Sequence, residues 1–300
     1  MAPLAPDTPP ELALRQIATA CRDDLLKHRA VVLKSRRPVG IHQTRVALRR
    51  LRAAFSLFRA AAEGDLARRE MEALGAEAKW LAGECAPARD LHVFLTETVE
   101  AVPPAATRVT QRLARSHLER ARAALSGDRF STFEVALAGF IDHVPATPAG
   151  RLDVFGKSVL DARHGKVLKR AHRLGSLDGR RLHRLRIAIK KLRYAAEFLL
   201  PVYAAPPFAS RAAKPYIEAT VRLQGALGAL NDHAVADRML VDIAAASRLD
   251  EHIERALASL AKQAAAGDKR RRHKLQRAWK KFEKAGRFWR ATTKHGVGKT

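Results

Sequence analysis

Residues 42–52 read HQTRVALRRLR, and residues 183–193 read HRLRIAIKKLR, 141 positions further along the chain. Six positions match in residue or in charge, pairing His42 with His183, Arg45 with Arg186, Arg49 with Lys190, Arg50 with Lys191, Leu51 with Leu192 and Arg52 with Arg193. A second pair of motifs follows in the same order, because LAGECAPARD ends at Asp90 and LQGALGALND ends at Asp232, 142 positions later. Two motifs that recur in one order at nearly one offset indicate an internal repeat.

The repeat divides the chain into two homologous halves, about 9–145 and 150–290, which we expect to be related by a pseudo-twofold axis. The segment PATPAG (145–150) is the natural junction between them. Residues 1–8 are rich in Pro and Ala and are expected to be disordered, and 291–300 to form a flexible tail. Whether the halves are separable domains or share one interface is left open.

The apolar residues predict an all-α fold. They are mostly Ala and Leu, which favour helices, and no sustained alternation of Val, Ile and Thr indicates a strand. Helical periodicity recurs from Leu12 to about Trp289, broken by Gly and Pro at intervals typical of helices of roughly 15–25 residues. Short connections between such helices favour an antiparallel bundle.

Both copies of the basic motif carry two neighbouring stripes when they are placed on a helix. The apolar stripes, which we expect to face the core, are Leu48, Leu51, Phe55 and Phe58, and Ile189, Leu192, Ala196 and Leu199. The cationic stripes are His42, Arg45, Arg49 and Arg52, and His183, Arg186, Lys190 and Arg193. Each cationic stripe therefore lies beside the core edge and not opposite it.

The charge pattern of these helices points to an anionic ligand. Residues 34–59 hold eight Lys or Arg and no acid, and 179–193 hold seven and no acid. Like charges one helical turn apart cost a few tenths of a kcal/mol each, so the stripes lower stability. A stripe beside the core edge is placed to line a groove between helices, where Arg can clamp phosphate. A solvated face or a salt-bridged core edge remains the alternative.

Two further features have two interpretations each. The last helix, about 268–290, holds 11 Lys or Arg, and Leu275, Trp279, Phe282 and Phe288 can dock it. This helix either extends the surface that binds a polyanion or is a solvated final helix. Asp90 and Asp232 are expected at helix starts, where Asp is a favourable cap. We expect them to support the cations and not to contact the ligand, since a carboxylate repels phosphate.

Composition limits the setting and the chemistry. The chain of 300 residues has a net charge of +26, which favours a polyanionic partner. Cys21 and Cys85 are too few for a disulfide scaffold, and neither a signal peptide nor a membrane span is evident, so a reduced cytoplasmic setting is expected. The twelve histidines form no cluster with metal-ligand spacing, and we find no nucleophile motif and no cofactor motif. The sequence therefore predicts no bound metal, no cofactor and no enzymatic activity.

The chain resembles the conserved histidine α-helical domain (CHAD) family. The resemblance rests on 41–58, 182–199, ARDLHVF (88–94), LQGALGALND (223–232) and AWKKFEKAGRFW (278–289), and covers about 8–290. It implies two four-helix-bundle-like halves around a basic groove or pore, and the stand-alone form, since no E-x-E-x-K strand of a CYTH domain is present. Pro87 departs from the second half and places Arg89 in doubt as a ligand.

The family resemblance also implies binding of inorganic polyphosphate, with a role in targeting to or organising polyphosphate stores or granules. Carried over by position, the contacts are His42, Arg45, Arg49, Arg50, Arg52, His183, Arg186, Lys190, Lys191 and Arg193. The alternative is a non-specific nucleic-acid-binding protein. The basic charge supports it, because phosphate contacts dominate non-specific affinity, but no recognisable reading module and no set of exposed stacking aromatics is seen. An enzyme acting on polyphosphate is the third class, and the basic stripes lack the carboxylates that would hold its metal.

Overall fold

The computed structural model describes residues 4–35, 39–59, 61, 62, 64–93, 104–143, 150–204, 206, 208, 210–246 and 267–290, without the side chains of 93, 104–109, 231–246 and 268. Every regular element in these residues is helical, which confirms the all-α prediction. The helices are α1 (Pro10–Lys34), α2 (Val39–Phe58), α3 (Gly64–Glu84), α4 (Ala86–Val93), α5 (Pro104–Ser126), α6 (Asp128–His143), α7 (Leu152–Ala171), α8 (Gly179–Ala204), α9 (Ala213–Ala246) and α11 (Asp268–Lys284), with short 3₁₀ turns η2 (Leu174–Ser176) and η3 (Phe288–Arg290).

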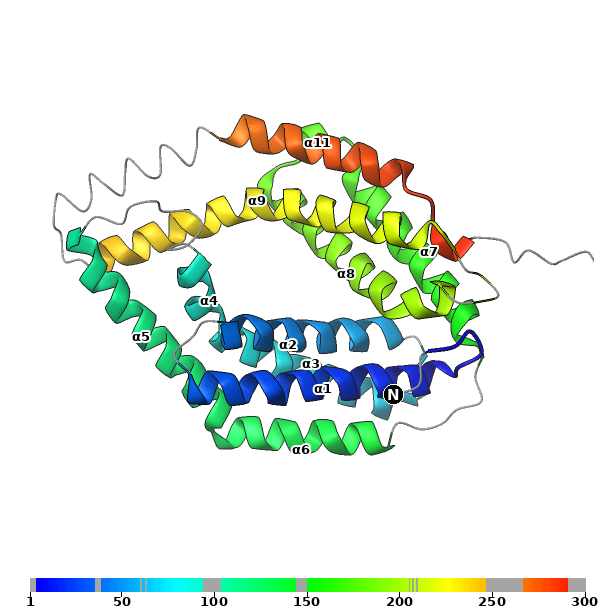
Figure 1. Ribbon diagram of the computed structural model, residues 1–300, viewed down its shortest axis with the longest axis horizontal. Helices are drawn as coiled ribbons and strands as arrows, with labels where there is room; N and C mark the ends of the chain where they lie inside the picture. The colour runs from blue at the N-terminus through cyan, green and yellow to red at the C-terminus, as the bar shows by residue number, and fades with distance from the viewer. Residues whose placement is uncertain are drawn as a thin grey trace, which may run out of the picture.

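Most helices of the two halves lie in two regions of the molecule, and α5 of the first half runs from the lower region up to α9 (Figure 1). In that view α1, α2, α3 and α6 lie below, and α7, α8, α9 and α11 lie above. The two regions meet where α2 contacts α8, and α5 contacts α9 on the other side. The pseudo-twofold relation remains a prediction, and most of the 145–150 junction lies outside the described residues.

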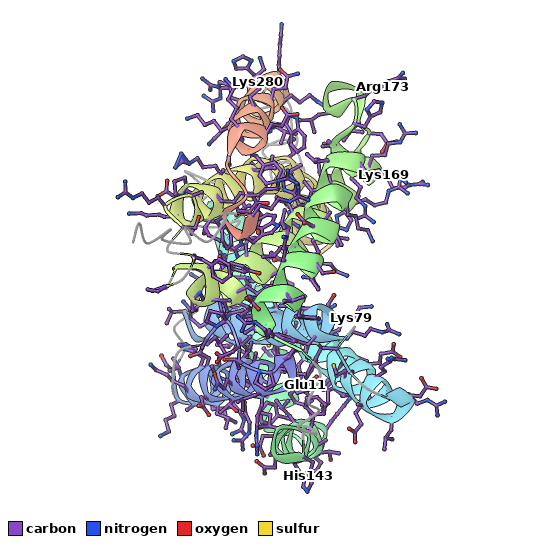
Figure 2. All side chains as sticks on the ribbon, turned by 90° about the vertical axis from the view of Figure 1, so that its right-hand side faces the viewer. Glu11, Lys79, His143, Lys169, Arg173 and Lys280 are labelled. Atoms are coloured by element: carbon purple, nitrogen blue, oxygen red, sulfur yellow. The ribbon has the colours of Figure 1, made fainter. Side chains whose placement is uncertain are left out.

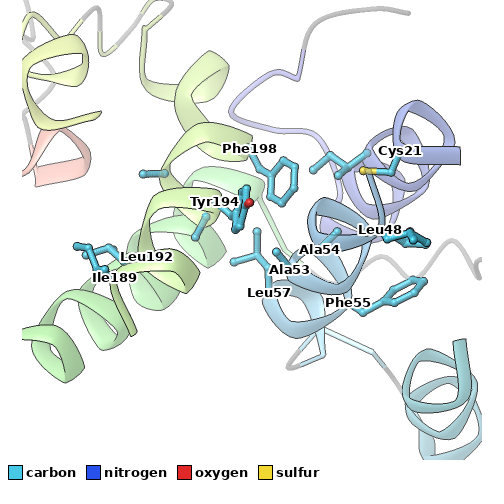
Figure 3. Close-up of a cluster of buried hydrophobic side chains, with 14 of the residues drawn as sticks. Cys21, Leu48, Ala53, Ala54, Phe55, Leu57, Ile189, Leu192, Tyr194 and Phe198 are labelled. Atoms are coloured by element: carbon cyan, nitrogen blue, oxygen red, sulfur yellow. The ribbon is translucent and has the colours of Figure 1, made fainter. Parts of the chain in front are cut away.

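The interface between α2 and α8 is part of one continuous hydrophobic core. All eight residues of the two predicted apolar stripes are buried, which confirms the periodicity argument. Figure 3 shows Tyr194 and Phe198 of α8 pointing toward Leu57 and the small Ala53 of α2. Further along, Phe58 of α2 stacks on the ring of α7's Phe155, with ring centroids 5.4 Å apart. The halves therefore share a core and are not separately packed.

Several helix ends coincide with Pro or Gly residues. Pro10 stands at the first turn of α1, where its missing N–H costs nothing. Pro104 begins α5, and Gly127 separates α5 from α6. The N-terminal stretch that was expected to be disordered contains a turn at residues 5–8, which accepts two backbone hydrogen bonds from the start of α7.

The last helix is shorter than the sequence indicates. It ends at Lys284, because Ala285 is extended, and the chain continues into η3. The predicted docking is confirmed for Leu275, Phe282 and Phe288, which are buried, while Trp279 is partly buried. The expected tail at 291–300 lies outside the described residues.

The η3 turn is held against α7 and α9 by aromatic and polar contacts. Trp289 packs edge-on against Tyr216 at 4.9 Å, and its Nε1 donates to Asp161 of α7 at 2.9 Å. Tyr216 and the buried His164 ring are hydrogen-bonded at 2.8 Å. Burial lowers the pKa of His164 to about 4, so this ring is neutral and structural near pH 7.

No helix in the described part of the chain is both long and apolar enough to cross a bilayer.

Candidate functional site: two basic helices and their neighbours

The first half places its signature cations beside α3 and α4. His42 and Arg45, near the start of α2, are partly buried. Arg89 of α4 donates from Nε to Nδ1 of His42 at 2.9 Å, and Arg45 donates from Nη1 to the Ala82 carbonyl of α3 at 3.3 Å. Arg89, which sequence reasoning placed in doubt, therefore lies next to the first signature residue. Pro87 is accommodated in the first turn of α4.

Burial and neighbouring charges act together on the arginines of this group. Burial lowers the pKa of Arg45, the Asp90 carboxylate opposes that shift, and the like charge of Arg49 adds to it. The Nε of Arg49 is buried without a hydrogen-bond partner. A buried guanidinium N–H that makes no hydrogen bond is costly, but this atom has almost no surface open to solvent, so a ligand oxygen reaches it only if neighbouring side chains move.

The expectation that Asp90 and Asp232 stand at helix starts is wrong. Asp90 lies in the interior of α4, which begins at Ala86, because the turn at Cys85 separates α3 from α4 earlier than the motif suggests. Asp232 lies inside α9, which runs without a break from Ala213 to Ala246. The side chain of Asp232 is outside the described residues, so its expected supporting role stays a prediction.

The second half presents its equivalent cations from the start of α8. His183 is exposed, while Arg186 and Lys190 are partly buried. Both Arg186 and Lys190 have further polar or electrostatic contacts. The cations of both halves are thus carried on the N-terminal parts of α2 and α8, and the C-terminal parts of the same helices form the shared core described above.

One carboxylate links the two signature helices. Glu197 of α8 lies 3.8 Å from Arg50 of α2 and 3.3 Å from Arg193 of its own helix. The Arg50 guanidinium also lies 5.0 Å from the ring centre of Phe198, and Arg193 lies 4.9 Å from that of Tyr194. We call Arg50, Arg193 and Glu197 the Glu197 cluster. Two of the ten predicted contacts are therefore already paired with an acid.

A second group of cations centres on Lys191 of α8, and Arg163 of α7 connects Lys191 with Ser56 of α2. Arg163 of α7 donates to the Ser56 carbonyl and to the Lys191 carbonyl, each at 2.7 Å. Burial lowers the pKa of Lys191, and four like charges lower it further, which places Lys191 within electrostatic reach of the other cations. We call this group the Ser56 cluster; its cations are Arg52, Arg163, Lys166, Arg170 and Lys191.

Sequence reasoning missed part of this arrangement. Arg163, Lys166 and Arg170 lie outside the repeated motif, and a repeat of charges on α7 at spacings of three and four was the only available signal. Glu197 was also missed: it lies four residues after Arg193, but its contact with Arg50 depends on how α2 and α8 pack. Figure 2 shows that Lys169 of α7 and Arg173, which follows α7 in the chain, also point outward.

The described residues contain no group of side chains suited to nucleophilic catalysis or to metal binding. Cys21 and Cys85 are buried and free, and burial raises the pKa of each to about 11. Both thiols are therefore protonated near pH 7. Among the residues whose side chains are described, no group of three His, Cys, Asp or Glu side chains lies close enough to hold a metal ion.

The fold and the site define the class of this protein: an all-α protein in which two repeated basic helices meet at a shared core. The sequence matches the CHAD domain family over residues 16–241, and the chain belongs to that family. It is similar to the crystal structure of the CHAD domain from the plant Ricinus communis, with 26% identity, 94% of each chain covered and a TM-score of 0.81.

A more distant similarity concerns the fold alone. PptA from Streptomyces chartreusis is 18% identical, with 93% of this chain and 99% of that chain covered and a TM-score of 0.60. No protein with a curated description matches the sequence.

Proposed function

We propose that this CHAD protein binds inorganic polyphosphate and catalyses no reaction of its own. The proposed contacts are the ten signature residues of α2 and α8, with Asp90 and Asp232 as supports. The observation that carries the proposal is the row of His42, Arg45 and Arg49, all partly exposed, on a helix that contains no acid. Phosphate oxygens are the natural acceptors for such guanidinium groups.

The chemistry of polyphosphate fits this surface better than that of nucleic acid does. Polyphosphate carries about one charge per phosphate and no bases, so it needs regularly spaced cations and little else. Single-strand binders stack bases on exposed aromatic rings. In the part of the chain whose side chains are described, the exposed large hydrophobic residues are all aliphatic. Membership of a family linked to polyphosphate supports the same ligand, and the proposal extends to a role in organising polyphosphate stores.

Calorimetry with long-chain polyphosphate tests the proposal at two salt concentrations. We expect tight binding that weakens with added salt, because phosphate binding releases counterions. The variants R45Q/R49Q and R186Q/K190Q should each reduce affinity at least about tenfold, equivalent to about 1.4 kcal/mol. The matched control is R68Q/R69Q, which removes the same charge at exposed positions of α3, outside the two signature helices.

Two further measurements separate this function from its alternatives. Single-stranded DNA at equal phosphate concentration should not displace polyphosphate, and equal displacement would make nucleic acid the better candidate. Release of orthophosphate in the presence of Mg²⁺ or Mn²⁺ would show an enzyme. Unchanged affinity in both stripe variants, with circular dichroism showing intact helices, would overturn the proposed site.

A further inference from the structure

The two ends of the interface between α2 and α8 are equivalent in the repeat but differ in charge. With the offset of 141 that aligns the signatures, Glu197 corresponds to Ser56, Arg193 to Arg52, and Lys191 to Arg50. At one end Glu197 lies between Arg50 and Arg193. At the other end a serine stands in the place of the carboxylate. The repeat therefore provides an internal comparison of the same cation pair with and without its acid.

The end that lacks the acid gains cations instead. Arg163 of α7 reaches Ser56, with its Nη2 2.7 Å from the carbonyl oxygen and 3.5 Å from Oγ. Its Nη1 donates to the Lys191 carbonyl, and Arg170 donates to the Arg184 carbonyl at 2.7 Å. All of these acceptors are neutral, so they orient the guanidinium groups without compensating their charge.

No carboxylate in the described part of the chain pairs with any cation of the Ser56 cluster. Burial is the cause that lowers the pKa values of Arg52 and Arg163, and no acid opposes it. For Lys191 the further contributions all come from like charges. Lys166 and Lys191 are exposed, while Arg52 and Arg170 are partly buried, so the cluster is open to solvent on one side. Such a group repels itself in the absence of an anion.

We propose that the Ser56 cluster is a phosphate-binding site in which successive phosphoryl groups of a polyphosphate chain supply the negative charge that Glu197 supplies at the equivalent position. The proposal rests on the proposed function, and it assigns Arg163, Lys166 and Arg170 of α7 to the binding surface. Partly buried Arg groups held by backbone carbonyls are preorganised for oxyanions, and exposed Lys groups add charge without fixed geometry.

The nature of the site favours a chain of phosphates over a single phosphate. Five cations without an acid exceed what one phosphate of charge near −2 can neutralise, whereas several linked phosphates can satisfy them together. The cations come from three helices, so the bound chain would cross the meeting point of α2, α7 and α8 and connect the α7 surface with the signature helices.

Two variants test the site in opposite ways. K166Q/R170Q removes two exposed or half-exposed cations, and S56E adds the carboxylate that the other end possesses. Each should reduce affinity for long-chain polyphosphate at low salt by about tenfold, or about 1.4 kcal/mol, while R68Q/R69Q changes it less than about twofold. Without ligand, S56E should melt at a higher temperature than the wild type, because the added carboxylate relieves repulsion among the cations. Tripolyphosphate should raise the melting temperature of S56E by less than it raises that of the wild type.

The outcomes distinguish this site from the proposed function. If R45Q/R49Q weakens binding while K166Q/R170Q and S56E bind as the wild type does, the Ser56 cluster is not a site, although the protein still binds polyphosphate. If the wild type itself does not bind polyphosphate, both proposals fall. Should S56E fold poorly, K166Q/R170Q decides alone, since both of its positions are on the α7 surface. Equal displacement by single-stranded DNA would overturn the polyphosphate assignment.

Discussion

Arg89 of α4 donates a hydrogen bond from Nε to Nδ1 of His42 of α2, over 2.9 Å. Because Nδ1 accepts this bond, the proton of the neutral ring is on Nε2, which is then a donor. The bond also joins two segments that are 47 positions apart in the sequence. The first histidine of the signature is thus oriented by an arginine from the second motif of the same half.

Removal of Arg89 should therefore weaken polyphosphate binding through His42. We expect R89A to reduce affinity about fivefold to tenfold, which corresponds to the loss of about one charge-assisted hydrogen bond. Calorimetry measures the change, and R68A on α3 is the control for a lost surface charge. If R89A and R68A have equal effects, the orientation of His42 by Arg89 is irrelevant to binding.

The stacked pair Phe58 and Phe155 should couple the stabilities of the two halves. F58A should lower the free energy of unfolding by about 3–5 kcal/mol, because it removes a buried ring and leaves a cavity. The measurement is urea unfolding followed by circular dichroism. A double-mutant cycle with F155A should show a coupling of about 0.5–1.5 kcal/mol. Strictly additive effects would contradict a direct contribution from the stacking.

Two glycines of α7 should respond oppositely to alanine. A Cβ at Gly156 would lie 3.0 Å from the Tyr203 hydroxyl and 3.2 Å from Leu199, whereas a Cβ at Gly165 would meet open space. G156A should therefore destabilise the protein by about 1–3 kcal/mol through overpacking. G165A should stabilise it by about 0.5–1 kcal/mol, because alanine is the better helix former. Thermal unfolding of the two variants checks both signs, and stabilisation by G156A would refute the close packing.

Asp161 should make the docking of η3 dependent on pH. Burial alone would raise the pKa of this carboxyl, but hydrogen bonds from Arg290 and Trp289 outweigh it and leave the pKa below its ordinary value. A depressed carboxylate pKa stabilises the fold above the unfolded-state pKa of about 3.9, and this contribution is lost as the pH falls through the folded-state value.

The matching variant is D161N, which keeps the shape and removes the charge. Its melting temperature should lie below that of the wild type at pH 7, and the difference should shrink as the pH falls below about 4. D65N on α3, where the carboxylate is exposed and pairs at 3.5 Å with Arg68, is the control. A D161N deficit that persists unchanged at low pH would exclude the charge as its cause.

The outline of the fold was predictable because it depends on local periodicity. Apolar residues at spacings of three and four identified the buried stripes of α2 and α8, and the structure buries all eight. Helix ends were less predictable where a tertiary contact decides them. The last helix ends at Lys284, and Trp289 and Arg290 instead turn to meet Asp161, which is 128 and 129 positions away.

By itself, the sequence determined the helical class, the internal repeat, the buried stripes and the concentration of cations on two helices, because each is a property of neighbouring residues. Tertiary structure decided the pairings that join different helices, whereas Arg193 and Glu197 are one turn apart on the same helix. Glu197 reaches Arg50 and Arg163 reaches Ser56 only because α2, α7 and α8 pack together, across 107 positions in the second case. Equivalent positions of a repeat share a pattern, but their electrostatic partners come from distant segments that the repeat does not conserve.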